Sequence, residues 1–265
     1  MRIEYLARPG RTLDDKRLEA LVAELRATAA ACFAELPDYQ CLRGTREELE
    51  DKVITIAREA DGTMAGFCSA VILPVRGAGD VLHLGLTCVR PTVRGGGMTH
   101  KLTSHLVVRY LLTHNPLGRQ WITNVACVLS SLGNVALNFD ECYPSPEGPE
   151  APSRTHRMIA ESVSQRYRDK AYILPEAEFD GDAFVFRGSV KGTVFQKSAE
   201  DARYHHRDAG VNRYYLDRMA FDEGDEVLQV CSIRLASIAN YAFKRGRAWL
   251  ARATTRRLET ARRTA

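Results

Sequence analysis

The sequence lacks the features that mark several classes of protein. Its most apolar run, residues 66–75, is about half as long as a bilayer-spanning helix, so no membrane span is expected. The first fifteen residues have no apolar centre of the kind found in secretory signal peptides, and the last three match no address signal. The seven cysteines are odd in number and never spaced CxxC. We therefore expect no disulfide framework, no metal site and a reducing cytoplasmic location.

Aromatic residues are also few, at 8% of 265 residues, against 45% hydrophobic and 26% charged residues. This is an ordinary globular composition, which excludes a wholly disordered, collagen-like or coiled-coil chain. The net charge of +4 is unevenly distributed, because residues 241–265 carry eight Lys or Arg and one Glu, which leaves −3 for residues 1–240. A nucleic-acid binder more often spreads its basic residues over a folded face, so nucleic acid is not the expected partner.

Hydrophobic periodicity predicts alternating strands and helices in the first 145 residues. We expect strands over 1–7, 52–59, 64–74, 81–89 and 121–128, and helices over 12–32, 97–114 and 132–140. Beyond a proline-rich stretch at 144–152, weaker patterns predict helices over 153–167 and 210–219 and strands over 183–188 and 225–234. The order is that of a mixed α/β fold.

The domain organisation follows from these elements. We expect a core at 1–145, an elaboration at 146–240 that completes the same domain, and a basic terminal helix at 241–265. A small separate unit over 150–265 is the alternative. The single elaborated domain is preferred because the first part lacks a convincing final hairpin.

The most informative segment is VRPTVRGGGMT at residues 89–99, between a predicted strand and a predicted helix. Glycines let the backbone approach a ligand closely, and a helix N-terminus presents unpaired amides and a positive dipole end. Together they favour an anion site for a pyrophosphate, with added contacts from Arg94 and Thr99. An ordinary glycine-rich turn is the alternative. The spacing is neither that of a P-loop nor GxGxxG.

A strand ending in V-x-P, followed by R-G-x-G and an amphipathic helix, resembles motif A of the GNAT superfamily of acyl-CoA-dependent N-acyltransferases. The element order over residues 1–145 is similar to that family as well. The resemblance implies a mixed, mostly antiparallel sheet flanked by helices, here with a C-terminal elaboration. It also implies that the loop holds the coenzyme A pyrophosphate and that the preceding strand end pairs with the pantetheine arm. The implied cofactor-binding residues are Thr87, Cys88, Val89, Arg94, Gly95, Gly96, Gly97, Met98 and Thr99.

The sequence departs from the family pattern at two places. Thr99 stands where the family usually has Gly or Ala. The family's next helix carries a tyrosine thought to reprotonate the coenzyme A thiolate, and here Phe139 falls near that position and has no proton to donate. Tyr143, one turn later, is the candidate acid, although Pro144 indicates that the helix has already ended.

His83 is the candidate general base, because imidazole titrates near neutrality. Strict alternation places His83, Gly85, Thr87 and Val89 on one face of their strand, so His83 would face the same cleft as the cofactor. The alternative is a partly buried histidine satisfied by a neighbour. The pair His205–His206 does not converge on a metal in either a helix or a strand. Cys88 is expected to be a buried thiol rather than a nucleophile.

The function expected from these residues is acetyl transfer from acetyl-CoA to an amine by direct attack. Three alternatives remain open. The first is a longer acyl-CoA or a decarboxylation on the same fold. The second is a coenzyme A-binding module without catalysis. The third is a nucleic-acid or membrane-surface binder acting through the Arg-rich C-terminus. The sequence identifies neither the acceptor nor the oligomeric state, for which a homodimer is one option.

Overall fold

The computed structural model describes residues 1–94 and 96–238 of the chain. Gly95 and the expected basic helix at 241–265 lie outside the described residues.

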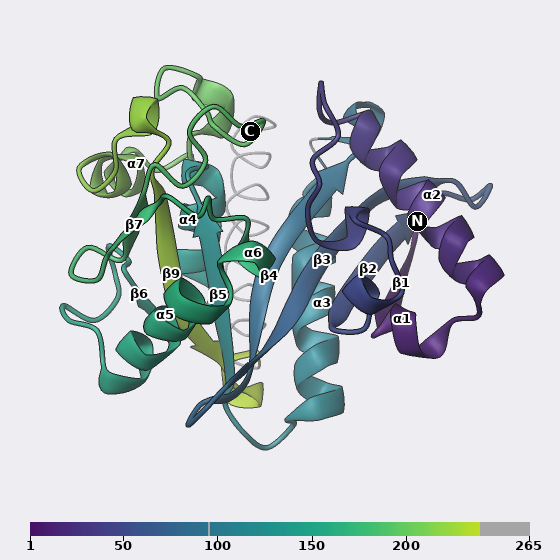
Figure 1. The fold of residues 1–265 in the computed structure, drawn as a ribbon, viewed down its shortest axis with the longest axis horizontal. Helices are drawn as coiled ribbons and strands as arrows, with labels where there is room; N and C mark the ends of the chain where they lie inside the picture. The colour runs from purple at the N-terminus through teal and green to yellow at the C-terminus, as the bar shows by residue number, and fades with distance from the viewer. Residues whose placement is uncertain (95, 239–265) are drawn as a thin grey trace, which may run out of the picture.

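The described residues contain one nine-stranded sheet with the order β1-β2-β3-β4-β5-β9-β8-β7, and β6 also pairs with β9 (Figure 1). All of its pairings are antiparallel except β4 with β5, which is parallel. The expected mixed, mostly antiparallel sheet is therefore confirmed. The strands are β1 (Arg2–Ala7), β2 (Lys52–Arg58), β3 (Met64–Val75), β4 (Gly79–Val89), β5 (Gln120–Ala126), β6 (Asp140–Tyr143), β7 (Glu178–Asp180), β8 (Val185–Arg187) and β9 (Glu226–Ile233).

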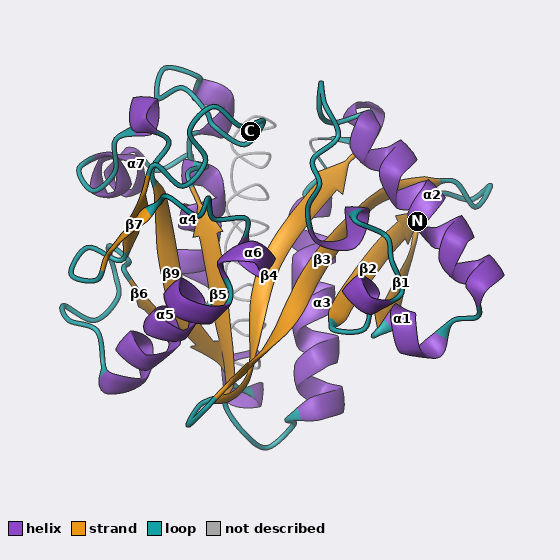
Figure 2. Ribbon diagram, in the orientation of Figure 1, coloured by secondary structure: helices purple, strands orange, loops and turns teal. Residues whose placement is uncertain are grey.

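Helices cover both faces of the sheet (Figure 2). On one face α3 packs through Met98, Leu102, Leu106 and Tyr110, the predicted four-residue spacing. On the other face α2 and α5 bury their own apolar stripes. The helices are α1 (Pro9–Thr12), α2 (Asp15–Ala30), α3 (Met98–His114), α4 (Leu129–Asn138), α5 (Arg154–Arg166), α6 (Arg168–Ala171) and α7 (Ala209–Leu216). Short 3-10 helices occur at Gln40–Leu42, Glu47–Leu49, Pro91–Val93, Ala202–Tyr204 and Phe221–Glu223.

A bulge in β4 changes which side chains share a face. Ala70 of β3 pairs with Leu84, but Cys68 pairs with Thr87, so two residues of β4 lie opposite one residue of β3. An extra residue reverses the alternation of every side chain beyond it. Leu84 accordingly packs in the core beneath α3, whereas Leu86 packs in the core beneath α2. The predicted shared face of His83, Gly85, Thr87 and Val89 is therefore wrong.

Candidate active site

The central feature of the molecule is a gap between β4 and β5. The two strands pair only from Leu82 to Leu84 and from Ile122 to Asn124, and then diverge (Figure 1). Residues 84–89 of β4 and 124–126 of β5 line a cavity of about 1260 Å³ that occupies the gap. Beyond Leu84, β4 pairs with β3 alone, so its other edge borders the cavity.

The N-terminus of α3 forms one mouth of this cavity. Gly97 adopts a left-handed conformation with φ 68° and precedes the helix, and within the described part of the chain no side chain caps it. The amides of the first turn therefore lack partners within the helix and carry the positive end of its dipole. Arg94 Nε donates to the Val89 carbonyl at 3.0 Å, which holds the guanidinium beside this turn.

Most of the predicted cofactor residues lie together at this mouth. Of the predicted cofactor residues, those that line the cavity are Thr87, Cys88, Val89, Arg94, Gly97, Met98 and Thr99. Gly96 is exposed and is not among the lining residues, and Gly95 lies outside the described residues. Cys88 is 1% exposed, and its hydrogen bond with Cys32 together with burial raises the pKa of its thiol. Cys88 is therefore a neutral, buried thiol.

The structure places His83 away from the cavity. His83 is 1% exposed and pairs with Val71, which belongs to the core beneath α5. Its Nδ1 shares a hydrogen bond of 3.0 Å with Thr123 Oγ1, and its buried Nε2 has no partner among the described residues. Burial lowers the pKa of His83 to about 4, so the ring is neutral at pH 7. His83 is therefore a buried histidine that hydrogen-bonds to a neighbour, as in the alternative considered above, and does not line the cavity as a general base would.

Tyr143 also lies outside the cavity. It is the last residue of β6, a strand that sequence periodicity did not predict, and its hydroxyl donates to the Asp182 carbonyl at 3.3 Å. Its ring packs edge-to-face on Phe184, with centroids 4.9 Å apart. The C-cap of α4, Phe139, does line the cavity. The position aligned with the family's tyrosine is thus at the site, but its side chain carries no proton to donate.

Glu226 is a functional candidate that the sequence did not reveal. It is the first residue of β9, lines the cavity and is 6% exposed. Ser189 Oγ donates to Glu226 Oε2 at 2.7 Å. Burial raises the pKa of Glu226 to about 7, although the bond from Ser189 acts in the opposite direction. A carboxyl that titrates near neutrality inside the cavity is suited to general-base catalysis.

Four aromatic rings line the cavity on the face of the sheet that α2 covers, opposite to α3. They come from separate parts of the chain and meet edge-to-face with centroids 4.8–5.7 Å apart. The rings belong to Phe33, Tyr39, Tyr172 and Phe195. We call these four residues the aromatic wall. Edge-to-face pairs are favourable beyond the apolar area that they bury, so the wall is a packed surface rather than a loose loop.

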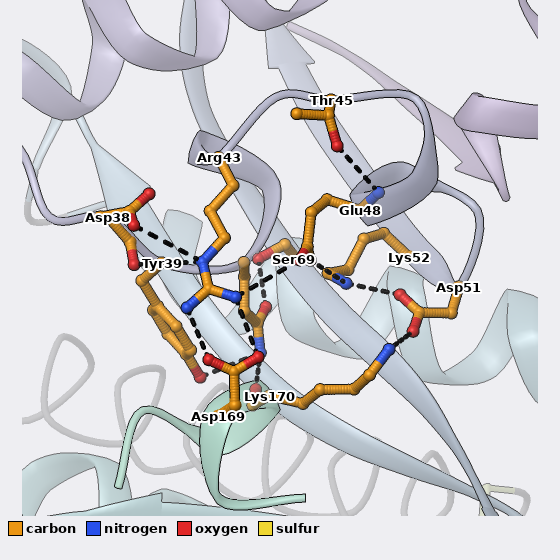
Figure 3. Close-up of polar contacts among 11 residues, drawn as sticks. Asp38, Tyr39, Arg43, Thr45, Glu48, Asp51, Lys52, Ser69, Asp169 and Lys170 are labelled. Carbon is orange, nitrogen blue, oxygen red and sulfur yellow. Dashed lines mark hydrogen bonds and ion pairs between the residues drawn. The ribbon is translucent and has the colours of Figure 1, made fainter. Parts of the chain in front are cut away.

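An ionic network fixes two members of this wall (Figure 3). The Arg43 guanidinium binds both carboxylate oxygens of Asp169 in α6, at 2.7 and 2.9 Å. Asp51 accepts from Lys170 and from Lys52, which is 1% exposed. The Arg43 contact lowers the pKa of Asp169. The network joins the segment that carries Tyr39 to the helix that precedes Tyr172, across the opening of the sheet.

A single glutamine connects the aromatic wall to the β4 bulge. Gln40 Nε2 donates to the Tyr39 hydroxyl at 2.9 Å, and Gln40 Oε1 accepts from Ser69 Oγ at 2.8 Å. Its amide occupies the space that a Cβ at Gly85 would need. A larger residue at position 85 would therefore displace the Gln40 amide from its place.

No protein-family model and no curated protein matches the sequence. The chain is similar in fold to GNAT acyltransferases. An acyl-CoA N-acyltransferase from Pseudomonas aeruginosa is 20% identical, covering 54% of this chain and 91% of that chain, with a TM-score of 0.38. Escherichia coli ElaA is 17% identical, covering 54% and 92%, with a TM-score of 0.38. The GNAT N-acetyltransferase YhbS from Escherichia coli, solved with CoA, is 14% identical, covering 53% and 70%, with a TM-score of 0.37.

Within residues 1–94 and 96–238, no group of three His, Cys, Asp or Glu side chains is placed to hold a metal ion. His205 Nε2 instead shares a hydrogen bond of 2.7 Å with the Ala199 carbonyl, and His206 packs against Gly133 of α4. In the same residues, no helix combines the length and the apolar character needed to cross a membrane.

Proposed function

We propose that the protein is an acyl-CoA-dependent N-acyltransferase that transfers an acetyl group from acetyl-CoA to an amine. The observation that supports this most is the divergence of β4 and β5 after Leu84 and Asn124, with a cavity that reaches from the α3 N-terminus to a buried carboxyl. A long, thin cosubstrate can enter such a gap from one mouth and meet a second substrate from the other.

The α3 mouth suits the coenzyme A portion. The first-turn amides and the Arg94 side chain favour a pyrophosphate, for which a helix N-terminus is a ready site. The edge of β4 beyond Leu84 offers main-chain groups to the amides of a pantetheine arm, as in strand addition. Thr99 is exposed at the first turn and its hydroxyl can add a phosphate contact. No metal is needed for this binding mode.

Glu226 is the residue that we assign as general base. It accepts a proton from the attacking ammonium group, directly or through one water, and the neutral nitrogen attacks the thioester carbonyl carbon. The new C–N bond forms, the C–S bond breaks, and the coenzyme A thiolate leaves and takes up a proton. Main-chain amides at the cleft stabilise the oxyanion of the tetrahedral intermediate. Ser189 holds the carboxyl in place through its hydrogen bond.

The experiment combines calorimetric titration with coenzyme A and mass-spectrometric detection of acylated product from acetyl-CoA and an amine panel. The proposal expects both binding and amine-dependent product. Binding without turnover on any amine would indicate a coenzyme A-binding module, which the phenylalanine at position 139 favours. Absence of coenzyme A binding would contradict the proposal. A series of acyl-CoA chain lengths tests the acetyl preference.

A further inference from the structure

Two side chains of opposite charge line the same cavity without an ion-pair partner. Among the described residues, no ion pair includes Glu226 or Lys197, although both border the cavity. Lys197 Nζ donates to the Val194 carbonyl at 2.7 Å and lies 5.4 Å from the centroid of the Tyr204 ring. Arg203, by contrast, is neutralised by its ion pair with Asp201. The two charges are thus available to a ligand that carries the opposite charges.

Strand pairing places both charges near one buried group, Cys127: β5 and β9 pair Ala126 with Val227, which brings Cys127 beside Glu226, and Cys127 also contacts the Phe195 carbonyl two residues before Lys197. Burial and the Glu226 carboxylate raise the pKa of the Cys127 thiol to about 12, and the Lys197 ammonium opposes this shift. The Cys127 thiol donates to the main-chain carbonyl of Phe195 at 3.4 Å, so the aromatic wall borders the same place. A carboxyl, an ammonium and an aromatic surface therefore meet at the far end of the cavity.

These three features define the shape of the acceptor. An ammonium group fits Glu226, a carboxylate fits Lys197, and an aromatic or branched apolar side chain fits the aromatic wall. A polyamine or a lysine-rich peptide fits poorly, because its further positive charges would meet Lys197, which has no acidic partner among the described residues. A simple arylalkylamine leaves Lys197 unpaired.

We propose that the acceptor is an α-amino acid with an aromatic or large apolar side chain, and that its α-amine is acylated. This inference rests on the proposed function. The zwitterion loses one ammonium proton to Glu226, and its nitrogen attacks the thioester carbonyl. The products are the N-acyl amino acid, as its carboxylate, free coenzyme A and one proton released to solvent. No oxidant, reductant or metal enters the balance.

The test compares four acceptors with acetyl-CoA in initial-rate assays on the full chain. They are phenylalanine, phenethylamine (which lacks the carboxylate), alanine (which lacks the ring) and spermidine. Phenylalanine is expected to have a kcat/KM about tenfold above each of the others, since each loses one charged or aromatic contact. Higher kcat/KM for spermidine or for phenethylamine would overturn the inference.

Two variants assign the contacts. Lys197→Met is expected to reduce the ratio of kcat/KM for phenylalanine to that for phenethylamine about tenfold. Phe195→Leu is expected to reduce the ratio of phenylalanine to alanine. Lys191→Met is the matched control, because Lys191 is exposed and pairs with Glu223 outside the cavity. Equal losses for phenylalanine and phenethylamine in Lys197→Met would contradict the carboxylate contact.

Titration of wild type and of each variant with coenzyme A distinguishes failure of the acceptor inference from failure of the acyltransferase proposal. Wild-type protein that binds coenzyme A and acylates only other amines overturns the acceptor class and leaves the acyltransferase proposal intact. Wild-type protein that binds no coenzyme A contradicts the acyltransferase proposal itself. Unchanged melting temperatures and coenzyme A affinities show that a variant is folded, so that its altered ratio reports the acceptor contact.

Discussion

The two mouths of the cavity are built in different ways. The α3 mouth is lined by residues that lie close together in the sequence, namely 87–89, Arg94 and 97–99, and the first-turn amides and the helix dipole favour an anion there. The other mouth, which we call the far mouth, is lined by the aromatic wall and Glu226, whose side chains come from four places in the chain: the loop with Phe33 and Tyr39, then Tyr172, Phe195 and Glu226. A main-chain site is encoded locally, because the conformation of a few neighbouring residues creates it. A side-chain site of this kind exists only once distant segments have packed together.

The two mouths also differ in how far their polar side chains are exposed to solvent. Thr99 and Arg94 are exposed at the α3 mouth, whereas Glu226 at the far mouth is 6% exposed and has a pKa raised to about 7. We therefore expect substitutions at the first mouth to affect affinity for the cosubstrate. Those at the second mouth should affect turnover, acceptor affinity and pH dependence.

The largest effect is expected at Glu226. Glu226→Gln should lower kcat/KM for the acceptor about 100-fold, because the amide cannot accept the proton. Wild-type activity should rise with pH through an apparent pKa of about 7, because only the ionised carboxylate accepts the proton, and the variant should lose this dependence. Steady-state rates between pH 5.5 and 9 measure both. Glu223→Gln, an exposed position outside the cavity, is the control.

The same group links stability to pH with a defined sign. The folded-state pKa of Glu226 lies above its ordinary value of 4.5, so between pH 4.5 and about 7 the folded protein binds more protons than the unfolded chain. The contribution of Glu226 to the free energy of unfolding should therefore fall as pH rises through this window. Denaturant titrations at several pH values give the free energy of unfolding, and its dependence on pH in this window should differ between wild type and Glu226→Gln. An identical pH dependence of stability would contradict the raised pKa of Glu226. Unchanged activity in the variant would contradict its role as general base.

A smaller effect, confined to the other mouth, is expected at Thr99. Thr99→Glu should weaken coenzyme A binding about tenfold, because a carboxylate at the first turn repels phosphate. Thr99→Gln has a similar size without the charge and should retain most of the affinity. Both variants should fold, since an acid in the first turn complements the helix dipole. Isothermal titration with coenzyme A distinguishes them, and equal affinity of the two would argue against phosphate at this turn.

A weaker effect is expected at Arg43, which does not line the cavity but holds two members of the aromatic wall in place through its ion pair with Asp169. Arg43→Met removes the double contact with Asp169 and should raise the acceptor KM about threefold, with coenzyme A affinity unchanged. Arg43→Lys keeps the charge but loses the planar pair of hydrogen bonds, so its KM should lie between wild type and Arg43→Met. Initial-rate kinetics measure the series. A parallel loss of coenzyme A affinity would mean that the two mouths are not separable.

The smallest effect on activity is expected at His83. His83→Asn should leave kcat/KM within about twofold, because a residue outside the cavity takes no part in proton transfer. Stability should respond instead. The folded-state pKa of about 4 lies below the ordinary 6.5, so wild type should lose stability as pH falls from about 6.5 to 4, when the unfolded chain takes up the proton first. The variant should lose this part of the acid sensitivity.

The sequence predicted most of the longer helices and strands, because they depend on local pattern. The four-residue spacing of α3 and the glycine-rich turn before it are legible in consecutive residues. The strands β8 and β9 were also predicted close to their positions. Their order in the sheet does not follow their order in the sequence, because β9 pairs with β5 and lies between β5 and β8.

The errors share a physical cause. His83 was assigned to the cleft on strict alternation, and the bulge at Gly85 and Leu86 placed it on the opposite face from Thr87. Tyr143 was offered as the acid on a helical alignment, but the chain turns into β6 after Asn138. Glu226 gave little signal, since a charged residue at the start of a strand is ordinary until burial around it is known. Long-range packing decides each of these three positions.

The glycine at the β4 bulge has a consequence for the whole cavity. Because Gln40 fills the space beside Gly85 and also donates to the Tyr39 hydroxyl, one amide contacts both the strand that leads to the α3 mouth and a ring of the aromatic wall. A side chain at position 85 would push this amide outward and carry Tyr39 with it. The strand that borders the cavity and the aromatic wall are therefore connected through one side chain, that of Gln40.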